Sequence, residues 1–475
     1  MSADMELTGL GVAELARRIA DREVSPVEAV QASLGRIERL DDHYRAFISV
    51  YPEAALVAAR EAEAALVAGA DLGPLHGVPL AVKDLFQVAG TERTCGSQVF
   101  RETVEEDATS VARLRQAGAI MIGLLNLQEF AFGPVGINPH HGTARNPWHP
   151  ERACGGSSAG SGCAVAASLV PGTLGTDTGG SVRIPASFCG VVGLKQTYGL
   201  ASRHGIYPLV DGFDHGGPLA WTVRDAAILL QAIAGSDPLD PSTSEARVED
   251  YTTGLEGGIE GLRIGVPKRG FFDDIHPDIE TNVRQAIAVL GELGAEVREI
   301  DPPFAAEFSD VWNALALPEC YAVHETRVIE QGELLSPDVT PRLKLGLDYS
   351  AVDYLKARQD QARIRAQMAA LLIDVDLIAT PTTPLPAVSA ESGNLEVEGR
   401  EIDGRAVLSQ FTRLACLTGQ PAIAVPCGFT ADGLPTSLML AGKWFEDAAL
   451  LRAAHAYEQA TPWHQRRPPE PGSGL

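Results

Sequence analysis

The chain has few cysteines, and their spacing does not suggest metal or disulfide chemistry. Seven occur in 475 residues, and none forms a Cys-x-x-Cys pair or lies beside a histidine cluster. An odd, scattered set of this kind favours reduced thiols and excludes a disulfide framework or a zinc site. We therefore expect neither a bound metal nor a cofactor.

Positive charge is also scarce. Lysine and arginine together number 38 against 62 acidic residues, which gives a formal net charge of −24. Phosphate backbones repel such a surface, so general nucleic-acid binding is excluded. We expect a small-molecule substrate and no nucleic-acid partner, with a homodimer as the default assembly.

Long apolar runs are missing as well. The run nearest to membrane length begins at Cys163 and is broken by Pro171 and Gly172. Acidic residues, Asp4 and Glu6, occupy the region where a signal peptide needs positive charge. These features predict a cytoplasmic protein without membrane contact.

What the chain does contain is an alternation of buried-strand and helix patterns, which predicts an α/β layer fold. Strands are expected near 78–82, 119–124, 261–267, 376–381 and 422–426, and helices near 10–20, 25–39, 53–68, 110–116, 161–169, 278–293, 354–372 and 446–461. We expect one large domain over 1–475. Its parts are a helical segment to about residue 70, a catalytic core at about 71–235, a surface linker at about 235–261, further sheet and helices at 262–465, and a flexible tail at 466–475.

Two loops rich in glycine and serine, 155–161 and 175–181, carry the strongest chemical signal. In the second, Gly179-Gly180-Ser181 places a hydroxyl on a turn with no side chain in front of it. The amides of Thr178, Gly179, Gly180 and Ser181 could then form an oxyanion hole. Taken alone, the same residues are also typical of a plain strand-to-helix turn.

Lys83 follows an apolar run, where burial lowers the pKa of an amine and lets its neutral form act as a base. A buried pair with Asp84 or Asp177 is the alternative. A second alternative is the G-x-S-x-G elbow of α/β-hydrolases, with Ser158 as nucleophile. That elbow needs a later acid and histidine, and the candidates His204, His215, His455 and His464 have no distinctive context.

Together these motifs resemble the signature of the amidase signature family of serine hydrolases. That signature is a GGSS-[GA]-G-S block, a small-residue helix, and a G-[TS]-D-x-G-G-S-x-R-x-P-A block, here 155–161 and 175–186. Similarity continues at 126–130, 145–148, 190–195, 380–384 and 419–422, so nearly the whole chain is covered. The resemblance implies a central mixed sheet with helices on both faces and hydrolysis of a linear carboxylic amide.

The resemblance also implies roles for individual residues. Ser181 would be the nucleophile, Ser157 a bridging serine in a cis peptide with Gly156, and Lys83 the base. Ser158, Asp177 and Arg183 would orient the loops. We further expect Phe132, Gly156 and Phe213 to bind substrate, and Trp312, Tyr321 and Tyr349 to make the pocket partly aromatic. Segments 96–100, 130–137, 207–213 and 304–354 would supply its walls.

Departures from the family pattern leave the substrate open. Cys154, Ala159, Gly212 and Trp221 stand where other residues are usual. Because no charge-binding residue is recognisable, we expect a neutral aryl or aliphatic amide. A carbamate or ester hydrolase with the same triad is one alternative. The glutaminase subunit of a tRNA-dependent amidotransferase is another, although the aspartate that precedes a Phe-Thr pair in such subunits is absent from 409–412.

Overall fold

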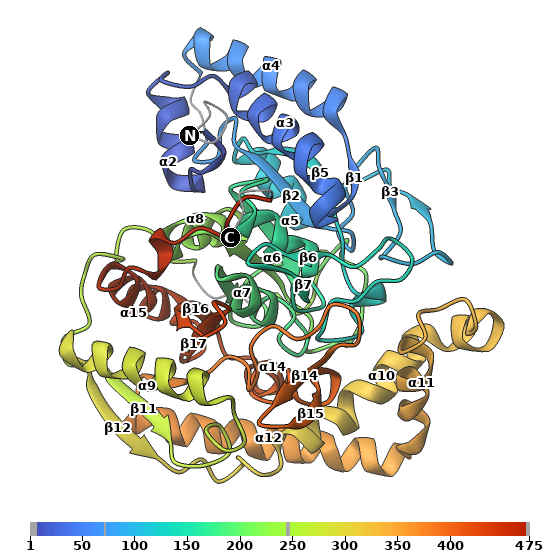
Figure 1. Cartoon of the computed structure of the whole chain (residues 1–475), viewed down its shortest axis with the longest axis vertical. Coiled ribbons are helices and arrows are strands. Elements are labelled where there is room, and N and C mark those ends of the chain that lie inside the picture. Colours follow the sequence, from blue (N-terminus) through green and yellow to red (C-terminus); the bar gives the residue numbers. More distant parts are fainter. Residues whose placement is uncertain (1–6, 71–72, 244–247, 472–475) are drawn as a thin grey trace.

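The structure is a computed structural model that describes residues 7–70, 73–243 and 248–471. The acidic start at residues 1–6 and the last four residues of the expected tail lie outside these ranges. Within them, one mixed sheet of eleven strands runs through the molecule (Figure 1). Its strands, in order across the sheet, are β1 (Phe47–Val50), β5 (Ile120–Leu125), β2 (Pro79–Lys83), β8 (Gly172–Thr176), β10 (Gly216–Ala220), β9 (Val192–Lys195), β16 (Ala422–Phe429), β17 (Pro435–Ala441), β13 (Leu377–Pro381), β11 (Arg263–Pro267) and β12 (Glu296–Ile300).

Parallel pairing is confined to two parts of the sheet. Strand β2 is parallel to both β5 and β8, and β11 is parallel to both β12 and β13, while the remaining neighbours are antiparallel. Parallel neighbours end at the same edge of a sheet, so residues that follow β2 and β8 come together. This edge positions the site described below.

Both faces of the sheet are buried, because successive side chains of a strand point in opposite directions. In β2, Leu80 and Val82 join one core cluster, whereas Ala81 joins the cluster on the other face. In β13, Leu377 faces the first cluster and Ile378 the opposite one. The predicted α/β fold, with helices on both faces of a central mixed sheet, is confirmed.

Each face has its own set of helices. The first face packs against α2 (Val12–Ala20), α5 (Thr109–Gln116), α8 (Val223–Ile233), α9 (Pro277–Glu292) and α15 (Asp447–Gln459). The opposite face packs against α3 (Pro26–Tyr44), α4 (Pro52–Ala68), α6 (Ala159–Ala166), α7 (Arg183–Cys189), α10 (Phe308–Gln331), α12 (Ala351–Asp374) and α14 (Arg413–Thr418). In Figure 1, α10, α11 (Val339–Lys344) and α12 extend to the lower right of the molecule, away from the helices α3 and α4 at the top.

Small additional elements complete the described chain. Three two-stranded ribbons pair β3 (Glu92–Arg93) with β4 (Glu102–Thr103), β6 (Arg145–Asn146) with β7 (His149–Ala153), and β14 (Asn394–Val397) with β15 (Arg400–Asp403). The helix α13 (Gly404–Val407) follows β15, and short 3₁₀ turns cover Glu129–Ala131, Leu345–Asp348 and Trp463–Gln465.

Helix α3 begins where the sequence predicts a capping box. The Ser25 hydroxyl accepts a hydrogen bond from the Glu28 amide at 3.1 Å, and the Glu28 carboxylate accepts one from the Ser25 amide at 2.8 Å. Two backbone donors that the helix cannot satisfy internally are thereby paired. The following proline, Pro26, supplies the backbone angle that a first helical residue needs.

The expected surface linker at 235–261 is only partly a surface segment. Its described residues form no helix or strand, as predicted, but Tyr251, Leu255 and Ile259 are buried in the core cluster that contains α8 and α15. Acidic and glycine residues between them masked this apolar spacing in the sequence. The segment therefore covers part of the core instead of lying wholly outside it.

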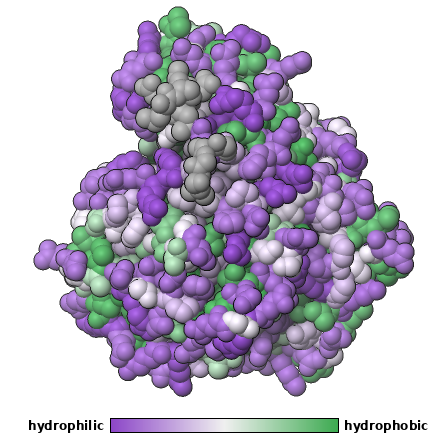
Figure 2. Space-filling model, viewed as in Figure 1, coloured by the Kyte–Doolittle hydropathy of each residue, from purple (hydrophilic) through white to green (hydrophobic). Residues whose placement is uncertain are grey.

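The surface is predominantly polar, with apolar residues scattered over the face shown in Figure 2. All seven cysteines are free thiols, and all seven are buried. In the parts of the chain that the structure describes, no helix combines the length and the apolar character needed to cross a bilayer.

Candidate active site

Lys83 is the last residue of β2, and its amine lies beside the end of the neighbouring strand β8. Its Nζ donates to Oγ of Ser157 at 2.7 Å and to Oγ1 of Thr176 at 2.8 Å. The side chain is fully buried. Burial lowers the pKa of the amine to about 7, although the carboxylates of Asp177 and Asp214 act in the opposite direction. The amine is therefore close to the point at which it loses its proton at neutral pH.

Ser157 lies in the turn between β7 and α6, and its peptide bond with Gly156 is cis. Its carbonyl accepts a hydrogen bond from the Gln128 amide at 3.0 Å, and its hydroxyl is the one that Lys83 contacts. The turn is closely packed, because a Cβ at Gly156 would stand 2.6 Å from the Gly136 amide nitrogen. The structure thus brings Lys83 and Ser157 together as expected.

Ser181 lies in the turn between β8 and α7, with 9 % of its surface exposed, whereas Lys83 and Ser157 have none. It is the one of these three residues that solvent or a ligand can reach. In the described chain, Oγ of Ser181 makes no hydrogen bond, to Ser157 or to any other group. The two serine turns are joined instead through the backbone, by a bond of 3.3 Å from the Ser158 amide to the Ser181 carbonyl.

Asp177 and Arg183 form a fully buried ion pair beneath the Ser181 turn. The carboxylate accepts two hydrogen bonds from the guanidinium, at 2.8 and 3.0 Å, and further ones from the amides of Gly180 and Val182. Burial raises the pKa of Asp177, but the charge and hydrogen bonds of Arg183 outweigh it, so the pKa is well below its usual range. The charged carboxylate binds two amides of the turn, where the resemblance implied a loop-orienting role for these two residues.

One of the four amides expected in the oxyanion hole, that of Gly180, is not free to bind a ligand. The Gly180 amide donates to Asp177 at 2.9 Å and is already engaged. Among the described residues, the amides of Thr178, Gly179 and Ser181 have no hydrogen-bond partner. These three are the donors left for a ligand, while Gly180 has a structural role that its φ of 127° also requires.

Two side chains orient the peptide planes of this turn. Trp312 Nε1 donates to the Thr178 carbonyl at 3.2 Å, and Thr412 Oγ1 donates to the Gly179 carbonyl at 2.5 Å. In a planar trans peptide the C=O and the following N–H point in opposite directions. Each hydrogen bond to a carbonyl therefore turns the next amide N–H away from the donor side chain. The Gly179 amide consequently points away from Trp312. Sequence reasoning assigned Trp312 to the pocket but missed this contact, and it missed Thr412 altogether.

Ser158 does not have the surroundings of an elbow nucleophile. It is fully buried, and its hydroxyl donates to the Thr176 carbonyl and accepts from the Thr176 amide, both at 3.2 Å. None of its hydrogen bonds involves a histidine. His215, whose ring lies beside the Asp177 backbone, is bonded to Lys195 and to backbone carbonyls instead.

A pocket of about 40 Å³ opens in front of Ser181, and it continues into an outer cavity of about 600 Å³. Phe132 and Trp312 line both spaces, as expected, and Tyr349 lines the outer one. Phe213 instead stacks behind Trp312, with ring centroids 6.2 Å apart, and lies in the core. Gly156, Tyr321 and the segment 96–100 do not line either space.

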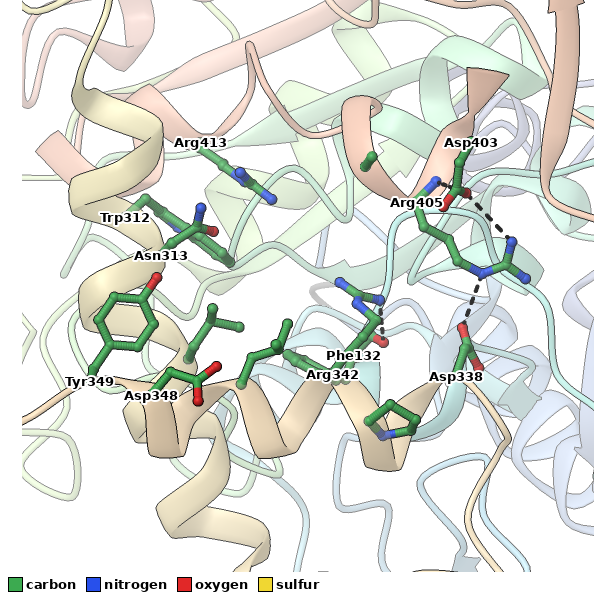
Figure 3. A pocket seen from close by; sticks show the side chains of 14 residues that line it. Phe132, Trp312, Asn313, Asp338, Arg342, Asp348, Tyr349, Asp403, Arg405 and Arg413 are labelled. Atoms are coloured by element: carbon green, nitrogen blue, oxygen red, sulfur yellow. Dashed lines mark hydrogen bonds and ion pairs between the residues drawn. The ribbon is translucent and has the colours of Figure 1, made fainter. Parts of the chain in front are cut away.

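Two arginines that sequence reasoning missed line both spaces, Arg342 from α11 and Arg413 from the start of α14 (Figure 3). The expectation of a neutral substrate depended on the absence of a charge-binding residue, and that premise is wrong. The signal for Arg413 was available, because it directly follows the Phe411-Thr412 pair, before which the resemblance places the glutamine-binding aspartate of amidotransferase subunits. Arg342 lies in an unremarkable helical stretch.

Comparison with known proteins gives a consistent assignment. The amidase family model matches residues 28–451. An amidase of Pseudomonas putida is 41 % identical, over 98 % of this chain and 99 % of its own length. A glutamyl-tRNA(Gln) amidotransferase subunit of a Geobacter species is 38 % identical, over 98 % and 100 %. The solved structure of a peptide amidase from Stenotrophomonas maltophilia has a TM-score of 0.84 and 32 % identity, covering 97 % of this chain and 98 % of that one.

The family match and the similar solved structures define the chain as a hydrolase. It belongs to the amidase family, and it is accordingly an amide-cleaving enzyme.

Proposed function

We propose that this protein hydrolyses a linear amide through an acyl-enzyme, with Ser181 as nucleophile, Ser157 as proton relay and Lys83 as base. The observation that carries the proposal is the 2.7 Å contact between Lys83 Nζ and Ser157 Oγ, made by a buried amine whose pKa is about 7. A neutral amine in this position can accept the proton of a serine hydroxyl.

The reaction follows from the positions of these groups. Oγ of Ser181 attacks the amide carbon as its proton passes to Oγ of Ser157, whose own proton passes to Lys83. The oxyanion is stabilised by the free amides of Thr178, Gly179 and Ser181. Return of the proton to the leaving nitrogen breaks the C–N bond and leaves an ester on Ser181. Water, activated by the same relay, then releases the acid and restores the serine.

One movement is required before the first step. The Ser181 hydroxyl has no hydrogen-bond partner among the described residues, so rotation about its Cα–Cβ bond must direct it toward Ser157. Catalytic hydrogen bonds are often formed only when substrate binds. The backbone bond between the two turns keeps the hydroxyls within the same small region.

A second candidate is the glutaminase subunit of an amidotransferase, because relatives with that name are similar over the full length. Subunits of that kind bind the glutamine amino group with an aspartate before the Phe-Thr pair. Here Ser409 and Gln410 precede Phe411, and Ser409 lines the pocket beside Ser181. The inner pocket at Ser181 therefore offers no carboxylate to the ammonium of glutamine. Carbamate or ester hydrolysis uses the same three residues and differs only in the leaving group.

The test is product release from an aryl amide, free glutamine and an aryl carbamate, combined with mass spectrometry of the trapped acyl-enzyme. We expect amide turnover by the wild type, an ester on the peptide that contains Ser181, and loss of both in Ser181→Ala. Ser161→Ala, which removes a buried hydroxyl of the same signature, is the matched control. Glutamine as the only substrate would favour the amidotransferase assignment, and preference for the carbamate would favour urethane chemistry. An adduct on Ser158 would overturn the assignment.

A further inference from the structure

Arg342 and Arg413 enter the substrate cavity from two different elements. Arg413 is the first residue of α14, and Arg342 lies in α11. Both line the inner pocket at Ser181 and the outer cavity, so they lie where the two spaces meet. In Figure 3 their guanidinium groups point into the cavity from opposite sides.

Neither arginine has an anionic partner in the described chain. Within residues 7–70, 73–243 and 248–471, no carboxylate oxygen lies within 4.0 Å of either guanidinium. Arg413 packs over the Trp312 ring at 4.6 Å, and its Nε is buried without a hydrogen bond. Arg342 packs over the Phe132 ring at 4.8 Å and makes one hydrogen bond, of 3.3 Å, to the Phe132 carbonyl.

The nearest acidic groups are engaged elsewhere or remain too distant. Asp338 acts electrostatically on Arg342, but its carboxylate is bonded to Arg405 at 3.4 Å and to Gln128 at 3.0 Å. Asp310 acts on Arg413 only beyond ion-pair distance. Arg405, across the same outer cavity, thus has the kind of partner that the two pocket arginines lack (Figure 3).

This arrangement is costly unless a ligand completes it. Burial lowers the pKa of Arg342, and burial together with the charge of Arg342 lowers the pKa of Arg413 to about 10. Two cations held together without an anion are destabilising, and a carboxylate placed between them would remove that cost. The pair is also exceptional in a chain of net charge −24.

Resting on the proposed amidase function, we propose that the substrate is a small amide that bears a carboxylate, which Arg413 and Arg342 bind while Ser181 attacks the amide carbon. The described residues that line the inner pocket include no aspartate or glutamate, so no carboxylate there would pair with an ammonium next to the carboxylate of the substrate. The inner pocket is much smaller than the outer cavity, which favours a compact acyl group. The carboxylate is consequently expected within a few bonds of the scissile carbonyl.

The test separates binding from turnover. Isothermal titration of Ser181→Ala would compare oxamate, malonamate, succinamate and glutaramate, each with the neutral primary amide of the same chain length. We expect at least one anion to bind about tenfold or more tightly than its neutral partner, with an affinity that falls as salt is raised. Adding Arg413→Gln should reduce that preference, with a much smaller effect on the neutral amides. Adding Arg363→Gln, which removes an exposed arginine of α12, should change neither.

The outcomes are distinct. If no anion binds better than its neutral partner, or if Arg363→Gln weakens the anions as much as Arg413→Gln, the inference is overturned. Preference for glutamine over glutaramate would also overturn it, because the pocket would then accept an ammonium. Ser181-dependent turnover of neutral amides alone would leave the proposed function in place without this substrate class. Anions that bind through Arg413 and are not cleaved by the wild type would support the carboxylate-binding site and contradict the proposed hydrolysis.

Discussion

Nζ of Lys83 and Oγ of Ser157 lie 2.7 Å apart, and neither side chain has any exposed surface. Buried amines in contact with a hydroxyl and with no adjacent carboxylate lose their proton easily, because the protein interior solvates the ammonium form poorly. The contact therefore makes activity sensitive to pH in a range where an exposed lysine would stay charged.

We predict that kcat/KM decreases below an apparent pKa of about 7. Below that pH, Lys83 is protonated and cannot accept the proton from Ser157; above it, the neutral amine is available. A pH–rate profile measured from about pH 5 to 9 would show this acidic limb. Lys83→Met should lower kcat by roughly 10²- to 10⁴-fold, while Lys356→Met, in α12, should not. A profile that stays flat to the acid end would contradict Lys83 as the base.

Thr412 is predicted to act by positioning the oxyanion-binding turn. Thr412→Val removes the hydrogen bond to the Gly179 carbonyl. The Gly179–Gly180 peptide, which links the free amides of Gly179 and Ser181, is then held only by the bond from the Gly180 amide to Asp177, and we expect kcat to fall by about 10- to 100-fold with little change in KM. Steady-state kinetics would measure this split. Thr418→Val, at the other end of the same helix, is the control, because its hydroxyl bonds only within that region. Equal losses of kcat in both variants would mean a general effect of helix α14.

The Asp177–Arg183 pair is predicted to dominate the stability of the site. Arg183→Met leaves a fully buried carboxylate without its cation, which should cost about 3–5 kcal/mol in the free energy of unfolding. Urea denaturation would measure the loss. The double variant Asp177→Asn/Arg183→Met should recover part of it, since the unpaired charge is gone. Arg363→Met, which breaks an exposed pair, should cost less than about 1 kcal/mol. A loss in Arg183→Met as small as that would contradict the prediction.

The capping box of α3 provides a stability change that is independent of the site. Ser25→Ala removes the side-chain acceptor for the Glu28 amide and should lower the free energy of unfolding by about 1 kcal/mol. Because the two cap bonds are exposed and link only Ser25 and Glu28, kcat and KM should be unchanged. Thermal unfolding and steady-state assays on the same preparation would test both statements. A change in kcat would indicate coupling between α3 and the active site.

Local patterns were sufficient to predict much of the fold. The strand β5 and the helices α4 and α9 lie within a residue or two of their predicted positions, because their apolar spacing is continuous and their ends are marked by Pro or Gly. The strands β8 and β10 were missed, since their sequences, GTLGT and GGPLA, are rich in glycine and poor in bulky apolar side chains. A Cβ at Gly217 would stand 2.3 Å from the Leu194 carbonyl oxygen, so close strand packing accounts for that glycine.

The candidate site was likewise predictable only where local sequence motifs mark its residues. Lys83, Ser157 and Ser181 each follow a strand or a glycine turn within a recognisable motif, so they could be proposed from the sequence. Arg342 and Arg413 lie in short helices whose local sequence is ordinary, and they meet only through the tertiary fold. The sequence also could not predict that neither arginine has an ion-pair partner among the described residues. Ion pairing depends on the groups that surround a side chain in the fold and not on its sequence neighbours.

Because every cysteine is buried, the reactivity of the thiols reports local unfolding of the protein. Thiol-specific reagents need an accessible thiolate, and burial raises the pKa of Cys95, Cys154, Cys320 and Cys416 besides shielding them. Alkylation in native buffer will therefore proceed only as fast as segments of the chain unfold transiently. Because the seven thiols are distributed from residue 95 to residue 427, mass-resolved labelling would give a map of local unfolding free energies without introducing a single probe.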